Sequence, residues 1–266
     1  MITRIIVAAI FGPMIIILCY FGGWWLLGMI LFLAVIGASE FLMNDSFKNS
    51  PVLFGVTLFY IICLILASAL ISFSISFIIF LSYFLLTGML LATRQESPAV
   101  LFSQMMKLLW IAVYAGLLYP FLYHIRELSD SGGDWLLFLF GTLWLSDSLA
   151  MWVGGAIGKR KLAPTVSPGK TVAGFVAGLS GGVVVAFILG WWRLSEYFLP
   201  LLVVGGLLVS FTGQLGDLVE SMWKRSIGIK DSSAIIPGHG GVLDRFDSMV
   251  FAAPVLFLYL KYFVYG

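Results

Sequence analysis

The sequence predicts an all-α, polytopic integral membrane protein with about nine transmembrane helices. Hydrophobic residues fill 61% of its 266 positions and charged residues only 11%, whereas soluble domains average about 45–50% and about 25%. A water-soluble fold of this size could not bury so much apolar surface. The apolar residues also form runs of the roughly 20 residues that one membrane-spanning helix needs.

Nine such runs follow one another along the chain. The first begins after Arg4 and resumes at once beyond Gly22 and Gly23, so we interpret it as a retained helix and not as a signal peptide. Only a few serines between positions 68 and 76 separate the third run from the fourth, and one long span there would give eight helices. The predicted spans are 4–21, 24–43, 51–71, 73–92, 104–124, 134–157, 170–192, 197–222 and 247–264.

The basic residues predict the orientation of these spans. Of the 15 Lys and Arg residues, only Arg126, Arg193 and Lys261 fall on one side of a nine-span protein. Cytoplasmic loops carry the excess of basic residues, and Trp is enriched at membrane interfaces. The tryptophans at positions 24, 25, 135, 191 and 192 fall at the outer ends of the predicted helices. We therefore expect a multi-pass protein of the cytoplasmic (inner) cell membrane, with its N-terminus in the cytoplasm and its C-terminus outside.

Polar residues divide the chain into two parts. Residues 1–92 carry almost no polar chemistry and are predicted to form transmembrane scaffold helices, whereas residues 93–266 are predicted to form a catalytic region. Two cytoplasmic loops in the second part, 158–171 and 223–246, contain basic residues and glycine; long connections in compact proteins are often functional. The net charge of +2 gives no indication of nucleic acid binding.

The eighth run ends in a charged stripe. At about 100° per residue, Asp217, Glu220, Ser221, Lys224 and Arg225 share one face of the predicted helix. Mutually satisfied ion pairs at a helix end are the plainer interpretation. Charges within a membrane span are costly, however, and usually mark a functional site, so we favour function for the acids.

The ninth run begins with two further acids, Asp244 and Asp247, which share a face with Ser248. The helix dipole favours a carboxylate at this position, but it explains one acid more readily than both. The preceding segment reads KDSSAIIPGHGG, in which Lys230 offers a cation for phosphate. Its glycines allow the backbone to approach an anion, and His239 lies among them. His124 falls at the outer interface and has no predicted role.

The sixth run contains the intramembrane acid Asp147, followed by a small-residue face at Ala150, Gly154 and Gly158 that suits close helix packing. The loop after it is basic. Phosphate binding would explain this, and so would the general excess of positive charge in cytoplasmic loops. Acids, cations and a glycine-rich turn thus gather at one membrane face. Carboxylates hold Mg²⁺, and Mg²⁺ with Lys and Arg neutralises polyphosphate, so we expect phosphoryl or nucleotidyl transfer there.

These motifs resemble those of the phosphatidate cytidylyltransferases (CDP-diacylglycerol synthases). The family pattern S-x-x-K-R-x4-K-D-x5-P-G-H-G-G-x-x-D-R-x-D is met at Ser221, Lys224, Arg225, Lys230, Asp231, Pro237, Gly238, His239, Gly240, Gly241, Asp244, Arg245 and Asp247. Asp147, Pro164 and the segments 158–161 and 167–171 are also similar, so the resemblance covers about residues 140–250. One departure is Ala173, where many members carry an acid.

The resemblance implies Mg²⁺-dependent transfer of CMP from CTP to phosphatidic acid, giving CDP-diacylglycerol and pyrophosphate. It leaves a second cation and a homo-oligomer open. The implied catalytic residues are Asp217, Asp244, Lys224, Arg225 and His239, and the implied metal ligands are Asp217, Asp244, Asp231 and Asp247. The implied substrate-binding residues are Asp147, Lys159, Ser167, Lys170, Thr171, Ser221, Lys230, Gly238, Gly240, Gly241 and Arg245.

Three alternatives stay open at this point. A CDP-archaeol synthase or a polyprenol kinase would use CTP on another lipid. An ion-coupled transporter would also need intramembrane acids, but the sequence lacks the inverted repeats and broken midplane helices typical of transporters. A purely structural scaffold is the weakest alternative, because it would not need the motif at 221–247.

Overall fold

The computed structural model describes residues 2–233, 235 and 240–266, and the backbone alone for 2–11 and 46. Within these residues eight helical segments are long and apolar enough to cross a membrane, and Gly12–Phe21 is a shorter apolar helix. The polytopic all-α prediction is confirmed. The first four helices are α1 (Ile2–Phe21), α2 (Gly23–Asn44), α3 (Pro51–Leu70) and α4 (Phe73–Ala92).

The break between α3 and α4 is real, so the nine-run interpretation holds against the single long span. Helix α3 ends at Leu70 and α4 begins at Phe73. The Ser72 side chain caps α4 by accepting a hydrogen bond from the Ile75 amide at 3.3 Å. The serines that marked this division therefore include the residue that starts the second helix.

The fifth span is longer than predicted and changes its winding. It begins at Pro98, and its parts are α5 (Pro98–Ile111), a π-helical segment (Ala112–Leu118) and α6 (Phe121–Glu127). Pro120 lies between the last two parts. A proline lacks the backbone N–H that would continue a regular helix, which gives a physical reason for the interruption.

The remaining spans are α7 (Gly132–Ile157), α8 (Val172–Trp192), α9 (Leu199–Ser226) and α10 (Leu243–Tyr259), which continues as a π-helical segment to Val264. Helix α9 continues four residues past its predicted end, and α10 begins four residues before its predicted start. The predicted spans, 197–222 and 247–264, exclude Lys224 and Asp244. Here Lys224 and Asp244 meet at 2.7 Å inside the protein, so the helices include them.

A short antiparallel hairpin replaces most of the predicted loop after α7. Strands β1 (Lys161–Ala163) and β2 (Ser167–Thr171) pair in the register Lys161 with Thr171 and Ala163 with Ser167. Strands of three and five residues are too short to be recognised in the sequence from an alternation of polar and apolar residues. Thr171 ends the hairpin and caps α8, because its hydroxyl accepts a hydrogen bond from the Gly174 amide at 3.1 Å.

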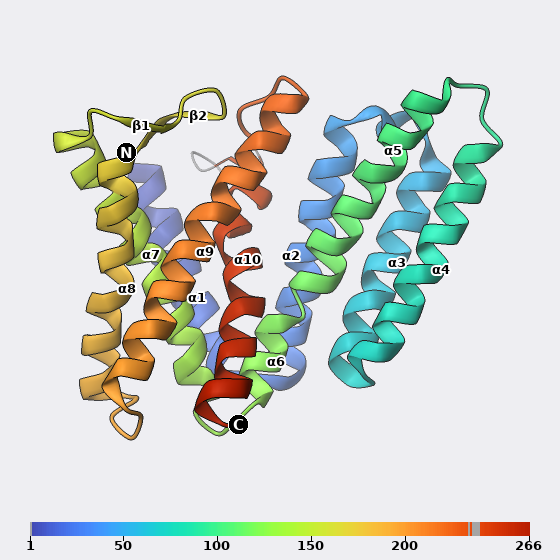
Figure 1. The fold of residues 1–266 in the computed structure, drawn as a ribbon. Coiled ribbons are helices and arrows are strands. Elements are labelled where there is room, and N and C mark those ends of the chain that lie inside the picture. Colours follow the sequence, from blue (N-terminus) through green and yellow to red (C-terminus); the bar gives the residue numbers. More distant parts are fainter. Residues whose placement is uncertain (1, 234, 236–239) are drawn as a thin grey trace.

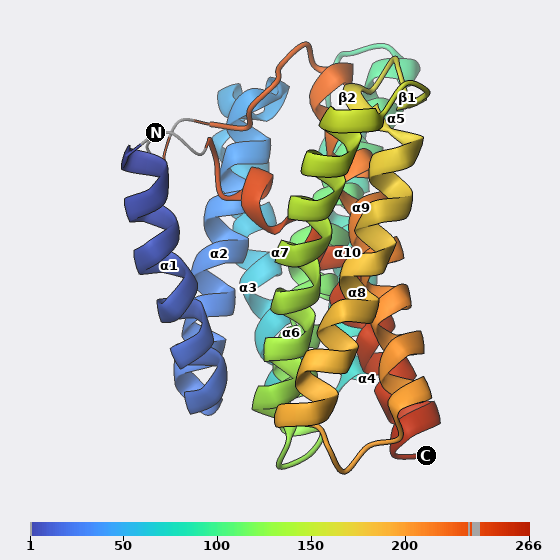
Figure 2. The same ribbon diagram turned by 90° about the vertical axis from the view of Figure 1, so that its left-hand side faces the viewer.

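Helices α7, α8, α9 and α10 pack side by side on one flank, and α3, α4 and α5 lie on the other, with α2 between them (Figures 1 and 2). Glycine allows the closest contacts: a Cβ on Gly182 of α8 would lie 2.1 Å from the carbonyl oxygen of Gly206 on α9. The predicted small-residue face of α7 is also confirmed. A Cβ on Gly154 would lie 2.9 Å from the Thr171 hydroxyl and 3.2 Å from the Gly174 Cα.

The hairpin, the end of α9 and the start of α10 lie at one end of the bundle, and the C-terminus lies at the other (Figure 1). Trp24 and Trp191 at that far end are 75% and 87% exposed, as expected for interface anchors. Trp135 differs, because it is buried and donates a hydrogen bond to the Tyr265 hydroxyl at 2.8 Å. Which end faces the cytoplasm stays a prediction.

Candidate active site

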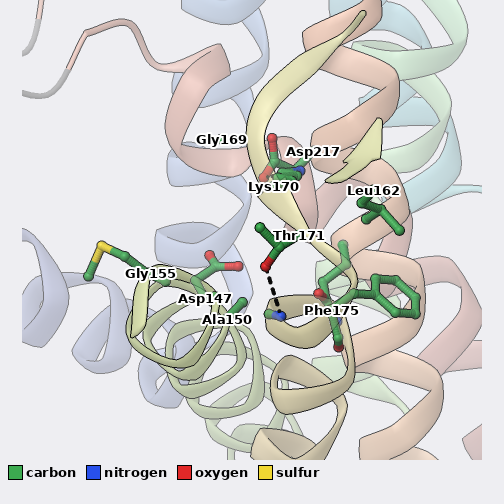
Figure 3. Close-up of a pocket in the computed structure, with 13 residues that line it drawn as sticks. Asp147, Ala150, Gly155, Leu162, Gly169, Lys170, Thr171, Phe175 and Asp217 are labelled. Atoms are coloured by element: carbon green, nitrogen blue, oxygen red, sulfur yellow. Dashed lines mark hydrogen bonds and ion pairs between the residues drawn. The ribbon is translucent and has the colours of Figure 1, made fainter. Parts of the chain in front are cut away.

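A cavity of about 390 Å³ opens between α7, β2, α8 and α9 (Figure 3). Its polar lining consists mainly of Asp147 from α7, Lys170 and Thr171 from β2, and Gln214 and Asp217 from α9. Four of these five residues were singled out from the sequence as site residues. The hairpin and the close helix contacts bring them together from three separate parts of the chain.

The charges in this cavity are only partly neutralised. Asp147 points into the cavity, below the ion pair between the Lys170 ammonium and the Asp217 carboxylate (Figure 3). That pair has an Nζ–Oδ2 distance of 2.5 Å, and its side chains are 25% and 31% exposed. The Ser221 hydroxyl donates a longer hydrogen bond to Asp217, at 3.3 Å. A cationic or phosphate-bearing ligand can therefore reach all three charged groups.

A second group of charges is buried beside this cavity. The Lys224 ammonium lies 2.6 Å from a Glu220 oxygen and 2.7 Å from an Asp244 oxygen. The three side chains are 10%, 2% and 4% exposed, in that order. We call these residues the buried triad. The ion pairs of the plainer interpretation are thus present at the end of α9, and they extend to α10.

Asp244 also joins the two ends of the connection between α9 and α10. Its carboxylate accepts hydrogen bonds from the Ser232 amide at 2.9 Å, the Ser232 hydroxyl at 3.1 Å and the Gly241 amide at 2.8 Å. Gly240 has a φ of +86°, and a Cβ there would lie 2.7 Å from the same carboxylate. A residue with a side chain would be strained and crowded at this position.

Two further residues of α10 belong electrostatically to the cavity. The buried Asp247 carboxyl interacts with the charges of Asp217, Glu220 and Asp147, and the exposed Arg245 interacts with that of Asp147. Asp247 also accepts a hydrogen bond from the Ser248 hydroxyl at 3.2 Å. The first turn of α10 therefore adds an acid and a base to the charges around the cavity.

Other predicted residues do not line the cavity. Lys159, Lys230 and Asp231 are exposed, and Ser167 begins β2. Arg225 is exposed and donates hydrogen bonds to the backbone carbonyls of Val166 at 3.2 Å and Ile229 at 2.9 Å, so it braces the hairpin. His239, Pro237 and Gly238 lie outside the described residues. The roles predicted for all of these residues stay predictions.

Sequence reasoning missed one acid, Glu40 of α2. This side chain is only 3% exposed and accepts hydrogen bonds from the hydroxyls of Ser232 and Ser233 and the amides of Val242 and Leu243. The available signal was an acid inside an apolar run, which is the signal that selected Asp147. The predicted boundary at residue 92 is untested, but a helix from the first part does contact the motif.

A Mg²⁺ ion fits this set of donors. Among the described residues no three His, Cys, Asp or Glu side chains converge into an all-protein site, and Mg²⁺ usually binds one or two carboxylates together with waters and substrate phosphates. Asp147 and Asp217 share one cavity, as that pattern requires. The charged groups around it are the acids Asp147, Asp217, Glu220, Asp244 and Asp247 and the bases Lys170, Lys224 and Arg245. Asp147 and Asp217 therefore offer the carboxylate oxygens, and Lys170 the neighbouring cation, that a Mg²⁺–phosphate complex needs.

An apolar groove of about 360 Å³ lies on the other side of α9, between α2 and α5. Phe41 and Trp223 stack in it at 4.5 Å between ring centroids, and Trp110 and Lys107 line its α5 side. A separate pocket of about 10 Å³ shares Phe41, Trp110 and Trp223 with the groove and is also lined by Glu220 of the buried triad.

Residues 2–263 match the Cytidylyltransferase family. A protein of Bacillus subtilis (strain 168) named phosphatidate cytidylyltransferase is 43% identical over 156 residues, which cover 57% of this chain and 56% of that protein. A protein of the same name from Staphylococcus saprophyticus is 45% identical over 143 residues, or 54% of each chain. Another from Staphylococcus haemolyticus is 34% identical over 258 residues, which cover 96% of this chain and 95% of that protein. The matched regions thus span about half of the first two relatives and nearly all of the third.

Proposed function

Because the chain belongs to the Cytidylyltransferase family, we propose that it transfers the CMP group of CTP to phosphatidic acid. The products are CDP-diacylglycerol and pyrophosphate. The family resemblance predicted from the motif at 221–247 is confirmed. The observation that carries the proposal is the cavity in which Asp147, Asp217 and Lys170 lie together, beside the buried triad.

The reaction forms one phosphorus–oxygen bond and breaks another. A phosphate oxygen of phosphatidic acid attacks the α-phosphorus of CTP, and the bond between that phosphorus and the bridging oxygen to the β-phosphorus breaks, so pyrophosphate leaves. The attacking oxygen is already anionic near neutral pH, so no strong general base is needed. Catalysis of this kind rests on positioning and charge neutralisation, which a site of fixed acids and bases supplies.

The cavity residues have distinct parts in this proposal. Lys170 exchanges its Asp217 partner for a phosphate oxygen of the nucleotide. Asp217 and Asp244 are the proposed metal ligands. Asp147 lies in the same cavity as Asp217, and Asp231 and Asp247 are proposed as supporting acids. Bound Mg²⁺ would neutralise the triphosphate charge. Lys224 keeps Asp244 in place through its 2.7 Å contact, and Arg245 adds positive charge near Asp147.

The lipid reaches the site from the side. Its acyl chains lie against the apolar groove at Phe41, Trp110 and Trp223, and its phosphate points inward toward α9. CTP enters from the aqueous end that carries the hairpin, which we assign to the cytoplasm from the distribution of basic residues. Transfer requires the lipid phosphate and the α-phosphorus of CTP to meet on one side of α9, at the charged end of that helix.

The test is pyrophosphate release by the purified, detergent-solubilised protein. Phosphatidic acid and Mg²⁺ are supplied with each of the four ribonucleoside triphosphates in turn, and dolichol and an archaeal ether lipid replace phosphatidic acid in parallel reactions. We expect release with CTP that requires both phosphatidic acid and Mg²⁺. Folded protein that releases no pyrophosphate under any of these conditions would overturn the proposal, and ion flux in liposomes without CTP would favour a transporter.

A further inference from the structure

We infer that Glu40 of α2 is a positioning residue for the transfer reaction, because it holds both ends of the α9–α10 connection in place. The expected effect on kcat rests on the proposed function, whereas the contact between Glu40 and the connection does not. Glu40 lies about 190 residues earlier in the chain than the groups it binds, in the part that the sequence presents as scaffold.

The Glu40 carboxylate uses both of its oxygens. Oε1 accepts from the Ser233 hydroxyl at 2.5 Å and the Val242 amide at 2.9 Å. Oε2 accepts from the Ser232 hydroxyl at 3.0 Å and the Leu243 amide at 2.9 Å. Two donors precede the undescribed part of the connection and two follow it. A single side chain thus ties residues 232–233 to residues 242–243.

The chemistry of this contact calls for a carboxylate. In the described part of the chain no Lys or Arg forms an ion pair with Glu40, so its compensation comes from four O–H and N–H donors. Two of those donors are amides at the start of α10, where the helix dipole favours negative charge. A glutamine would keep the size of the side chain but would turn an NH₂ group toward donors.

The contact continues directly into the candidate site. The single hydrogen of the Ser232 hydroxyl is shared between Glu40 at 3.0 Å and Asp244 at 3.1 Å, and Asp244 binds Lys224 at 2.7 Å. A Cβ on Gly241 would lie 2.0 Å from that hydroxyl and 2.6 Å from Glu40. The backbone therefore packs directly on the carboxylate, so movement of Glu40 would displace the groups that fix Asp244.

The first measurement is hydrogen–deuterium exchange of the purified protein, followed in peptides covering residues 228–233 and 240–246. We expect Glu40→Gln to speed exchange of the Val242 and Leu243 amides by about tenfold or more, since each loses a charged acceptor. Ser233→Ala is a milder variant that removes one donor and should give a smaller increase. Unchanged exchange in both variants would overturn the inference.

The matched control is Thr57→Val, which removes buried hydrogen bonds in α3 to the Leu53 carbonyl and the Tyr83 hydroxyl without touching the connection. In the CTP and phosphatidic acid assay, normalised to folded protein, we expect Glu40→Gln to lower kcat by about tenfold or more. The KM for the lipid should change less than about threefold, because all four contacts of Glu40 go to the connection. Glu40→Asp should recover part of kcat, and Thr57→Val should leave it within about twofold.

The outcomes separate the two proposals. A wild-type protein without CTP-dependent turnover contradicts the proposed function, while the exchange experiment still decides whether Glu40 holds the connection. If the wild type is active and Glu40→Gln has the same kcat as Thr57→Val, the positioning role is overturned. A loss of folded protein without a change in kcat per folded molecule also overturns it, because the side chain would then serve stability alone.

Discussion

Replacing Lys224 with methionine should destabilise the protein strongly. The Lys224 ammonium is the shared partner of Glu220 at 2.6 Å and Asp244 at 2.7 Å, and all three side chains are at most 10% exposed. Removing one partner of a buried ion pair costs about 3–5 kcal/mol, because it leaves uncompensated charge behind. Solvent screens this triad little, so no large reduction of that figure applies. For a chain of this size the cost corresponds to a fall in Tm of about 6–20 °C.

The assay is thermal unfolding of the detergent-solubilised protein at neutral pH, followed by circular dichroism. Arg225→Met is the matched control, because Arg225 is the neighbouring base but is exposed and contacts only backbone carbonyls. We expect it to lower Tm by less than about 3 °C. Equal values for Lys224→Met and Arg225→Met would refute the reasoning.

A second substitution identifies which acid, Glu220 or Asp244, causes the loss of stability in Lys224→Met. Without Lys224, Asp244 keeps the Ser232 and Gly241 amides as donors, whereas Glu220 has no other hydrogen-bond donor among the described residues. Glu220→Gln in the Lys224→Met background should therefore restore about half or more of the lost Tm. Failure of this rescue, together with rescue by Asp244→Asn, would show that the charge on Asp244 dominates instead.

Three further predictions concern the ligands, the groove and the packing. Asp217→Asn should lower kcat by at least about 100-fold with folding retained; Asp244→Asn also breaks the 2.7 Å contact with Lys224, so it should lower Tm as well as kcat per folded molecule. Near-normal turnover per folded molecule in both variants would remove the metal assignment. Trp223→Ala should raise the KM for phosphatidic acid several-fold and leave that for CTP unchanged; equal effects on both would argue against the groove as the lipid path. Gly182→Val should prevent stable folding, judged by size-exclusion chromatography, because a Cβ would lie 2.1 Å from the Gly206 carbonyl oxygen.

Hydrophobicity alone predicts the membrane helices, because burial in lipid demands long apolar runs with internally bonded backbone. It fails where charges are paired inside the protein. Lys224 and Asp244 fall outside the spans that hydropathy gives, although helical periodicity placed both at helix ends; in the structure they pair at 2.7 Å inside the protein. The prediction also misses the hairpin, for another reason. Strands of three and five residues are too short to show an alternation of polar and apolar residues.

The charged stripe on α9 was predictable from helical periodicity, but its partners were not. Which base meets which acid depends on how α9 crosses α10 and where the hairpin lies, and both are non-local. Lys170 pairs with Asp217 although 47 positions separate them, and Glu40 contacts residues about 200 positions away. Glu40 did carry a local signal, since an acid in a 22-residue apolar helix needs partners.

The two ion-pair groups differ in a way that assigns them different parts in the reaction. The Lys170–Asp217 pair is 25% and 31% exposed, and pairs with access to solvent contribute at most about 1 kcal/mol. A nucleotide phosphate can therefore displace Asp217 from Lys170 at little cost. The buried triad would lose about 3–5 kcal/mol by the same exchange. Substrate binding should thus rearrange Lys170 and leave Lys224 in place. The buried triad can then fix Asp244 from one side while Glu40, through Ser232, fixes it from the other.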